Sequence, residues 1–114
     1  MESSPESTIT QDFNPFATTA APYGMGATGL MYEPLYQFDL ANPAVSYPWL
    51  ATAYTWGDGG KSITFTIRPG VKWNNGTPLT PADVVFTYQL TQKYPAINLG
   101  GLKISSATSS GDTV

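Results

Sequence analysis

The sequence predicts a small mixed α/β (α+β) domain, in which a mainly antiparallel sheet packs against one or two helices. The observations that predict it adjoin one another in residues 61–90. Residues 62–67 alternate apolar with hydroxyl side chains, residues 68–76 contain two turn signals, and residues 80–90 open with a helix-start signal. A strand, two turns and a capped helix are therefore expected in one fixed order.

The predicted strand at 62–67 is expected to pair with the stretch before it. Ile63, Phe65 and Ile67 share one face of this strand, because successive side chains of a strand point to opposite sides. Residues 51–56 form a second candidate strand, and the glycine-rich run between the two is typical of a hairpin turn. The two strands are therefore predicted to form an antiparallel hairpin.

The predicted helix has recognisable signals at both ends. Thr80 is expected to be its N-cap, with Pro81 at the first helical position and Asp83 as a capping residue at the third. The helix is expected to run to about Lys93, whose charge suits the C-terminal end of the helix dipole, before Pro95 ends it. The apolar residues expected on its buried face are Ala82, Val85, Phe86 and Leu90.

Shorter elements are predicted on either side of this region. Residues 35–40 alternate weakly and are expected to form a strand. Residues 102–107 are predicted to form another strand, and residues 109–112 a turn. Thr113 and Val114 are then expected to begin a further strand.

Composition excludes several classes of function. The 114 residues are 41% hydrophobic, which suffices for one small core, and the net charge of −3 disfavours nucleic-acid binding. Cysteine and histidine are both absent, which removes disulfides, thiolate nucleophiles, serine–histidine triads and the commonest zinc ligands. We therefore predict no enzymatic activity, no cofactor and no metal. No apolar run approaches the ~18 residues that span a bilayer.

Two sets of side chains leave alternatives open. Glu33 is a lone carboxylate among apolar residues, and it is either a polar contact near a ligand cleft or, the favoured interpretation, a structurally satisfied charge. Trp49, Trp56 and Trp73 either form a platform for carbohydrate or are core and edge aromatics of the sheet. The second interpretation is favoured because tryptophan is heavily buried on average.

The central region also resembles a known family. Residues 64–87 read T-F-T-I-R-P-G-V-K-W-N-N-G-T-P-L-T-P-A-D-V-V-F-T. This order resembles the signature of the extracytoplasmic solute-binding proteins of family 5, the oligopeptide-, dipeptide- and oligosaccharide-binding receptors of ABC importers. The resemblance implies the N-terminal part of a periplasmic-binding-protein-like type II fold. Residues 9–40 would begin ligand-binding lobe I, and residues 41–114 would begin a truncated subdomain packed on it.

The resemblance also implies where a ligand would bind. In the family, a short strand ends in a motif similar to Phe13-Asn14-Pro15, and the segment that follows lies along the ligand cleft. Small side chains there let the backbone approach a ligand closely, and aromatic rings supply stacking faces. The candidate ligand-binding residues are Phe16, Ala17, Thr18, Thr19, Ala20 and Tyr23.

The implied function is capture of oligopeptides or oligosaccharides outside the cytoplasm, in the periplasm or at the cell surface, and delivery to ABC permease subunits. Residues 1–8 have the composition of a disordered leader and carry no secretory signal. Because members of the family are exported, the resemblance implies that Met1 replaces a removed leader. Family members are often lipoproteins, and any lipid anchor would lie outside this N-terminal fragment. The alternative is a free-standing carbohydrate-binding module that uses exposed tryptophan and tyrosine.

Overall fold

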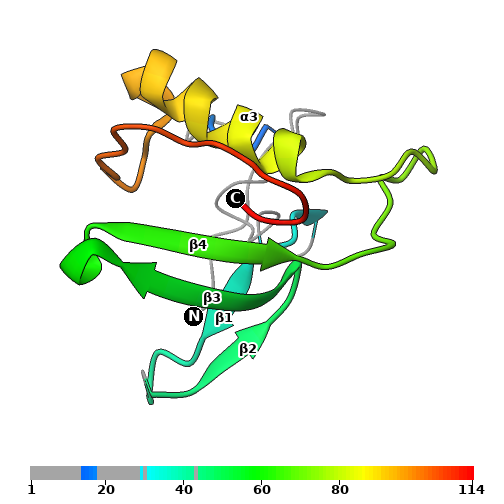
Figure 1. Cartoon of the computed structure of the whole chain (residues 1–114). Helices are drawn as coiled ribbons and strands as arrows, with labels where there is room; N and C mark the ends of the chain where they lie inside the picture. The colour runs from blue at the N-terminus through cyan, green and yellow to red at the C-terminus, as the bar shows by residue number, and fades with distance from the viewer. Residues whose placement is uncertain (1–13, 18–28, 30, 43) are drawn as a thin grey trace, which may run out of the picture.

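The computed structural model describes residues 14–17, 29, 31–42 and 44–114. Within them, two short strands are followed by a longer hairpin and one long helix (Figure 1). The strands are β1 (Tyr36–Phe38), β2 (Ser46–Pro48), β3 (Ala51–Gly57) and β4 (Ser62–Ile67), and the helix is α3 (Pro81–Lys93). Single 3₁₀ turns occupy Asp58–Gly60 and Pro95–Ile97. This is a mixed α/β architecture with antiparallel sheets, so the predicted fold class is confirmed.

Strands β3 and β4 form the predicted antiparallel hairpin. Tyr54 lies opposite Phe65 and Trp56 opposite Ile63, and the register shifts by one residue near Ala51. The shift is a local irregularity of the kind that bends and twists a strand. The hairpin is the largest sheet in the described part of the chain, and the other elements are placed around it.

Strand β1, which pairs with β2, packs on the hairpin through aromatic rings. The Tyr36 ring meets the Tyr54 ring edge to face, with centroids 4.9 Å apart, and the Tyr36 hydroxyl donates a hydrogen bond to the Thr52 carbonyl at 3.0 Å. Phe38 lies 6.4 Å from the same Tyr54 ring. The predicted strand at 35–40 is therefore confirmed in a shorter form. Its partner β2 was not predicted, because it has only three residues and ends in a proline.

The described core is small. Ala51 (0% exposed) and Ile67 (3% exposed) lie opposite each other in the hairpin, and Val85 of α3 is 8% exposed. These three are the buried hydrophobic residues in the described part of the chain. Burial along β4 rises from Ile63, which is 36% exposed, to Ile67. The core therefore lies at the end of the hairpin that is remote from its turn.

Helix α3 begins and ends where the sequence predicts. One carboxylate oxygen of Asp83 accepts hydrogen bonds from the backbone N–H of Thr80 at 2.7 Å and from its hydroxyl at 2.8 Å. These bonds stabilise the ionised carboxylate and lower the pKa of Asp83. Lys93 is the last helical residue, and its ammonium lies 5.5 Å from the centre of the Tyr94 ring.

The prediction of the buried face of α3 is wrong at two positions. Val85 is buried, and Val84 and Tyr88 are half-buried, whereas Ala82 is exposed and Phe86 is 62% exposed. Apolar residues occur on both sides of this helix, so their spacing alone does not select a face. Burial raises the pKa of the Tyr88 hydroxyl, which agrees with its inward position.

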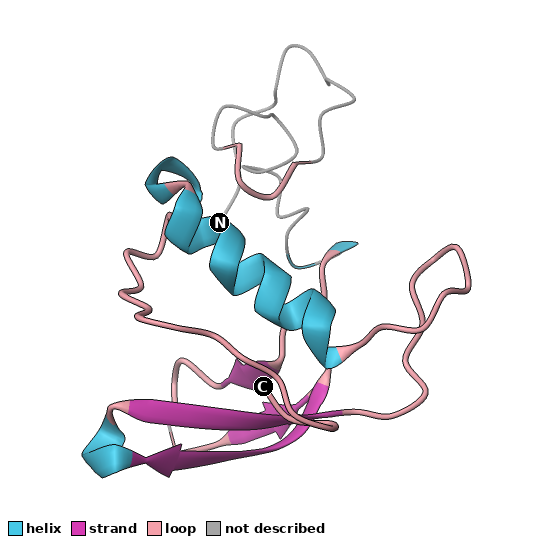
Figure 2. Cartoon of the chain, turned by 45° about the horizontal axis from the view of Figure 1, so that its top comes forward, coloured by secondary structure: helices cyan, strands magenta, loops and turns pink. Residues whose placement is uncertain are grey.

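Residues 102–107 do not form the predicted strand. The side-chain amide of Gln92 donates hydrogen bonds to the carbonyls of Ile104 at 3.2 Å and Ser105 at 2.9 Å. The amide of Gln89 donates another to the carbonyl of Ala107 at 3.3 Å. Side chains of α3 thus hold backbone groups that a sheet would otherwise pair, and Figure 2 shows this loop running between α3 and the hairpin.

The last residues of the chain pair with β4, as their predicted strand character implies. The Phe65 N–H donates to the Val114 carbonyl at 2.8 Å, and the Val114 N–H donates to the Phe65 carbonyl at 3.0 Å. The Ile67 N–H donates to the Asp112 carbonyl at 2.8 Å. Residues 112–114 therefore cover the free edge of the hairpin beside the core.

The connection from β4 to α3 contains the two predicted turns. Gly70 and Gly76 have positive φ angles of 77° and 86°. The Gly76 N–H donates to the Trp73 carbonyl at 2.8 Å, and Asn75 accepts hydrogen bonds from the backbone and hydroxyl of Thr77 at 3.0 and 2.7 Å. The second turn therefore needs a residue that adopts the left-handed region without cost.

Replacing Gly76 by alanine is expected to lower the free energy of unfolding by about 1–2 kcal/mol, the cost of left-handed backbone for a residue with a Cβ. An added Cβ meets no atom within 4 Å, so the backbone is the whole source of the cost. Urea denaturation followed by circular dichroism measures it. The matched control is Gly100→Ala, which is equally unobstructed but not left-handed. Equal losses in the two variants would contradict the assignment.

Candidate functional site

The segment predicted to contact ligand is described only at its start. The backbone N–H of Phe16 donates to the Asn14 side chain at 3.0 Å, and the N–H of Ala17 donates to the Asn14 carbonyl at 3.2 Å. These bonds form the turn expected at Asn14-Pro15, with Phe16 and Ala17 half-buried. The remaining candidates, Thr18, Thr19, Ala20 and Tyr23, lie outside the described residues, so the six-residue site stays a prediction.

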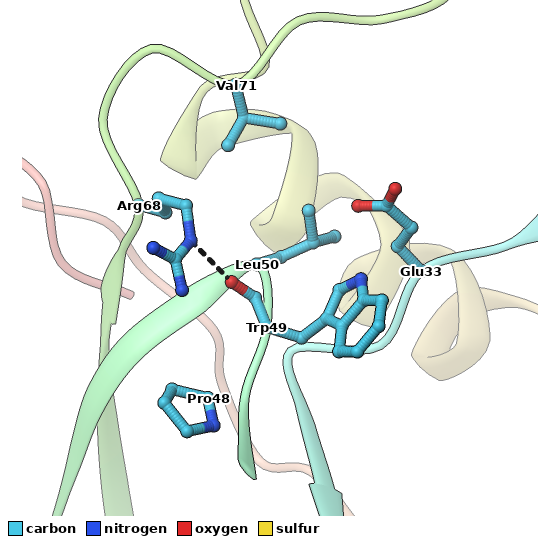
Figure 3. A pocket seen from close by; sticks show the side chains of 6 residues that line it. All are labelled: Glu33, Pro48, Trp49, Leu50, Arg68 and Val71. Atoms are coloured by element: carbon cyan, nitrogen blue, oxygen red, sulfur yellow. Dashed lines mark hydrogen bonds between the residues drawn. The ribbon is translucent and has the colours of Figure 1, made fainter.

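Two hollows adjoin each other around Trp49. The first has a volume of about 280 Å³ and combines charged with apolar side chains (Figure 3). It is lined by Glu33, Pro48, Trp49, Leu50, Arg68 and Val71. The second has a volume of about 410 Å³ and is mainly apolar. It is lined by Gly29, Pro34, Tyr36, Gln37, Phe38, Leu40 and Trp49. Trp49 is therefore the wall that the two hollows share.

Backbone hydrogen bonds fix the position of Trp49 at the corner between β2 and β3. Its N–H donates to the Leu35 carbonyl at 3.2 Å, and its carbonyl accepts a hydrogen bond from Nε of Arg68 at 2.8 Å. The Arg68 N–H donates to the Leu50 carbonyl at 2.7 Å. The indole stays 45% exposed, so a fixed backbone presents an accessible aromatic face.

Glu33 lines the first hollow beside this indole. Figure 3 shows its carboxylate and the guanidinium of Arg68 on different sides of the hollow, with Leu50 between them. Among the described residues, Glu33 has neither a hydrogen-bond partner nor an ion-pair partner. Glu33 is therefore a polar group of this hollow, and its contact with a ligand stays a prediction.

The three tryptophans are more exposed than the favoured sequence interpretation implies. Trp49 is 45% exposed, Trp56 60% and Trp73 48%. None of them is a core residue, so that part of the interpretation is wrong. Trp56 lies near the turn end of β3, and Trp73 lies in the connection to α3, where sheet packing does not reach them.

The described residues contain no group of three or more His, Cys, Asp or Glu side chains arranged to hold a metal ion. None of the described helices is long and apolar enough to cross a membrane. The described hollows offer one carboxylate, one guanidinium and several aromatic faces.

Comparison with known proteins identifies the family. Residues 46–108 match the profile described as bacterial extracellular solute-binding proteins, family 5 Middle. The chain belongs to this family. The matched region begins with β2 and continues through the β3–β4 hairpin and α3, and it leaves out β1 and residues 109–114. Family membership confirms the resemblance noted in residues 64–87 and the predicted extracytoplasmic location.

Individual relatives within the family differ in the ligand that their names state. The chain is 39% identical over 64 residues to a peptidoglycan-binding protein, YepA, of Agrobacterium fabrum, covering 56% of this chain and 10% of that protein. It is 32% identical over 99 residues to a probable peptide ABC transporter periplasmic-binding protein, y4tO, of Sinorhizobium fredii, covering 85% and 17%. The chain thus spans between a tenth and a sixth of the length of these relatives.

A solved structure confirms the fold type. The chain superposes with a TM-score of 0.60 and 38% identity on a mannohexaose-bound periplasmic oligopeptide-binding protein from Thermotoga maritima. The match covers 77% of this chain and 16% of that protein. The predicted periplasmic-binding-protein type of fold is therefore confirmed for the region that matches.

Proposed function

We propose that the chain is part of a solute-binding receptor of an ABC importer, which captures oligopeptides or oligosaccharides outside the cytoplasm and delivers them to the membrane permease. The observation that carries this proposal is the family match over residues 46–108, which coincides with the described strands β2–β4 and helix α3. The names of the relatives include peptide and glycan ligands. Binding without catalysis and membrane attachment through a lipid anchor belong to the same proposal.

In this receptor, residues 9–40 contribute to the first ligand-binding lobe, and residues 41–114 contribute to a subdomain packed on it. The backbone of residues 16–20 and the ring of Tyr23 contact the ligand, because small side chains allow close approach and an aromatic face allows stacking. The half-buried positions of Phe16 and Ala17 agree with this arrangement.

Ligand-induced thermal stabilisation tests the proposal. A ligand that binds only the folded state raises its stability by an amount set by the ligand concentration relative to Kd, about 2.7 kcal/mol at a hundredfold excess over Kd. We expect the Tm of the full-length protein to rise with either short peptides or cello-oligosaccharides, and to stay constant with free amino sugars as a control. No rise with any peptide or oligosaccharide would contradict the receptor function.

The exposed tryptophans favour a second candidate, a carbohydrate-binding module that acts alone. Trp49 and Trp56 present 45% and 60% of their surface, and flat aromatic faces stack on sugar rings. This candidate predicts that the 114-residue chain by itself binds oligosaccharide with a shift in indole fluorescence. The receptor proposal predicts weak or absent binding by that chain, because the matched relatives contain several times more sequence.

A further inference from the structure

The exposed turn between Lys72 and Pro78 places an asparagine, Asn75, directly before a glycine, Gly76. All residues from 72 to 78 are exposed, and a Cβ added at Gly76 meets no atom within 4 Å. No side chain therefore shields the backbone nitrogen of Gly76. Such a nitrogen can attack the carbonyl carbon of the preceding asparagine side chain, because the two groups are held close together by the same short piece of chain.

Thr77 supplies two hydrogen-bond donors to the side chain under attack. Its backbone N–H donates to Oδ1 of Asn75 at 3.0 Å, and its hydroxyl donates to the same oxygen at 2.7 Å. Attack on Cγ moves negative charge onto Oδ1, and donors at these distances stabilise such a charge. Within the described residues, Nδ2 of Asn75 has no hydrogen-bond partner, so no contact holds it as the leaving group.

One hydrogen bond opposes the reaction. The Gly76 N–H donates to the Trp73 carbonyl at 2.8 Å, and the nitrogen must give up this bond to reach Cγ of Asn75. Breaking a single exposed backbone bond slows the reaction by roughly threefold to tenfold. The two donors from Thr77 act in the opposite direction. The folded turn is therefore expected to keep most of the reactivity of the same sequence without structure.

The other asparagines lack this combination of features. Asn98 is followed by Leu99, whose side chain obstructs the backbone nitrogen. The Asn98 side chain is also held at both ends, since Nδ2 donates to the Leu102 carbonyl at 2.7 Å and Oδ1 accepts from the Leu102 N–H at 3.0 Å. The remaining asparagines precede either another residue with a side chain or a proline, whose nitrogen carries no hydrogen: Asn74, Asn14 and Asn42.

We propose that Asn75 is a site of spontaneous deamidation in the folded protein, with water as the co-reactant. Base removes the proton from the Gly76 nitrogen, which then bonds to Cγ of Asn75. The bond from Cγ to Nδ2 breaks, and Nδ2 leaves as ammonia with a proton from water. Water next opens the cyclic imide at the bond from the Gly76 nitrogen to Cγ, which gives aspartate, or at the bond to the backbone carbonyl carbon, which gives isoaspartate. Both products add a negative charge before α3, and isoaspartate also lengthens the main chain within the turn.

Peptide mapping by mass spectrometry tests this site in the full-length protein, incubated at neutral and at mildly alkaline pH. The reference is a synthetic peptide of residues 71–79, which contains the same asparagine and glycine without the fold. We expect Asn75 in the protein to convert at a rate within about tenfold of that in the peptide, and faster at alkaline pH. Asn98 should convert at least about tenfold more slowly than Asn75. A slower conversion of Asn75 than this, or a rate at Asn98 closer to it, overturns the proposal.

The substitution Thr77→Val tests the role of the hydroxyl, because it keeps the backbone N–H and the branched shape of the side chain. We expect it to slow conversion of Asn75 in the folded protein by about threefold to tenfold, less than the ~100-fold loss typical of an enzyme oxyanion donor, since water surrounds this turn. The same change in the peptide should have little effect, and Thr77→Ser, which keeps the hydroxyl, should retain the original rate. An equal or higher rate in Thr77→Val would show that Thr77 does not stabilise charge on Oδ1, and would overturn that part of the proposal.

Discussion

Replacing Ile67 by alanine is expected to lower the free energy of unfolding by about 2–4 kcal/mol, the range for truncating a buried isoleucine. Ile67 is 3% exposed and lies opposite the fully buried Ala51, at the point where residues 112–114 pair with β4. Urea denaturation monitored by far-ultraviolet circular dichroism measures the loss.

The same substitution at Ile63 is the control for this prediction. Ile63 occupies the same strand and the same face as Ile67, but it is 36% exposed. Because less apolar surface leaves water at that position, Ile63→Ala is expected to cost less than about 1 kcal/mol. Similar losses at the two positions would show that the core does not lie at the Ala51–Ile67 end of the hairpin.

The elements that the sequence predicts well are those specified by neighbouring residues. The alternation in residues 62–67 predicts a strand, and Gly59 and Gly60 adopt positive φ angles in the turn that follows β3. Thr80, Pro81 and Asp83 satisfy the first turn of α3 within four residues. Each of these signals involves neighbouring residues, so it specifies the same local structure independently of the rest of the fold.

The elements that the sequence mispredicts depend on distant partners. Residues 102–107 have the composition of a strand, but Gln89 and Gln92 of α3 donate hydrogen bonds to carbonyls of this segment. Within the described residues, no sheet edge pairs with it. Strand β2 has three residues and is paired with β1, a separate segment of the sequence. Which face of α3 is buried likewise depends on the segments that pack against it. The spacing of the apolar residues along the helix does not contain that information.

The hollows around Trp49 illustrate the same limit for the candidate site. Glu33, Trp49 and Arg68 come from three separate segments, and each alone looks like an ordinary surface or sheet residue. The hydrogen bond from Arg68 to the Trp49 carbonyl joins residues 19 positions apart in the chain. Patterns among neighbouring residues do not show which residues, distant in the sequence, lie side by side in the fold.

Replacing Asp83 by alanine is expected to lower the free energy of unfolding by about 1–2 kcal/mol at neutral pH, as the loss of a helix cap does. The change removes the acceptor of two hydrogen bonds from Thr80, at 2.7 and 2.8 Å, and a negative charge at the positive end of the helix dipole. Unfolding free energies of the two proteins, measured by urea denaturation between about pH 2 and pH 7, test the prediction.

The pH dependence identifies the carboxylate as the source of this stability. The Thr80 hydrogen bonds lower the pKa of Asp83 from its ordinary value of 3.8, so the folded state binds the proton less readily than the unfolded state. The contribution of Asp83 is therefore complete above that ordinary value and is lost as the pH falls through the lower pKa of the folded protein. The difference in unfolding free energy between the unaltered protein and Asp83→Ala should accordingly shrink in acid.

Asp83→Asn is the control, because it keeps an acceptor oxygen that does not titrate. Its unfolding free energy relative to that of Asp83→Ala should stay constant with pH. A difference between the unaltered protein and Asp83→Ala that persisted undiminished at about pH 2 would show that the ionised carboxylate does not stabilise the start of α3.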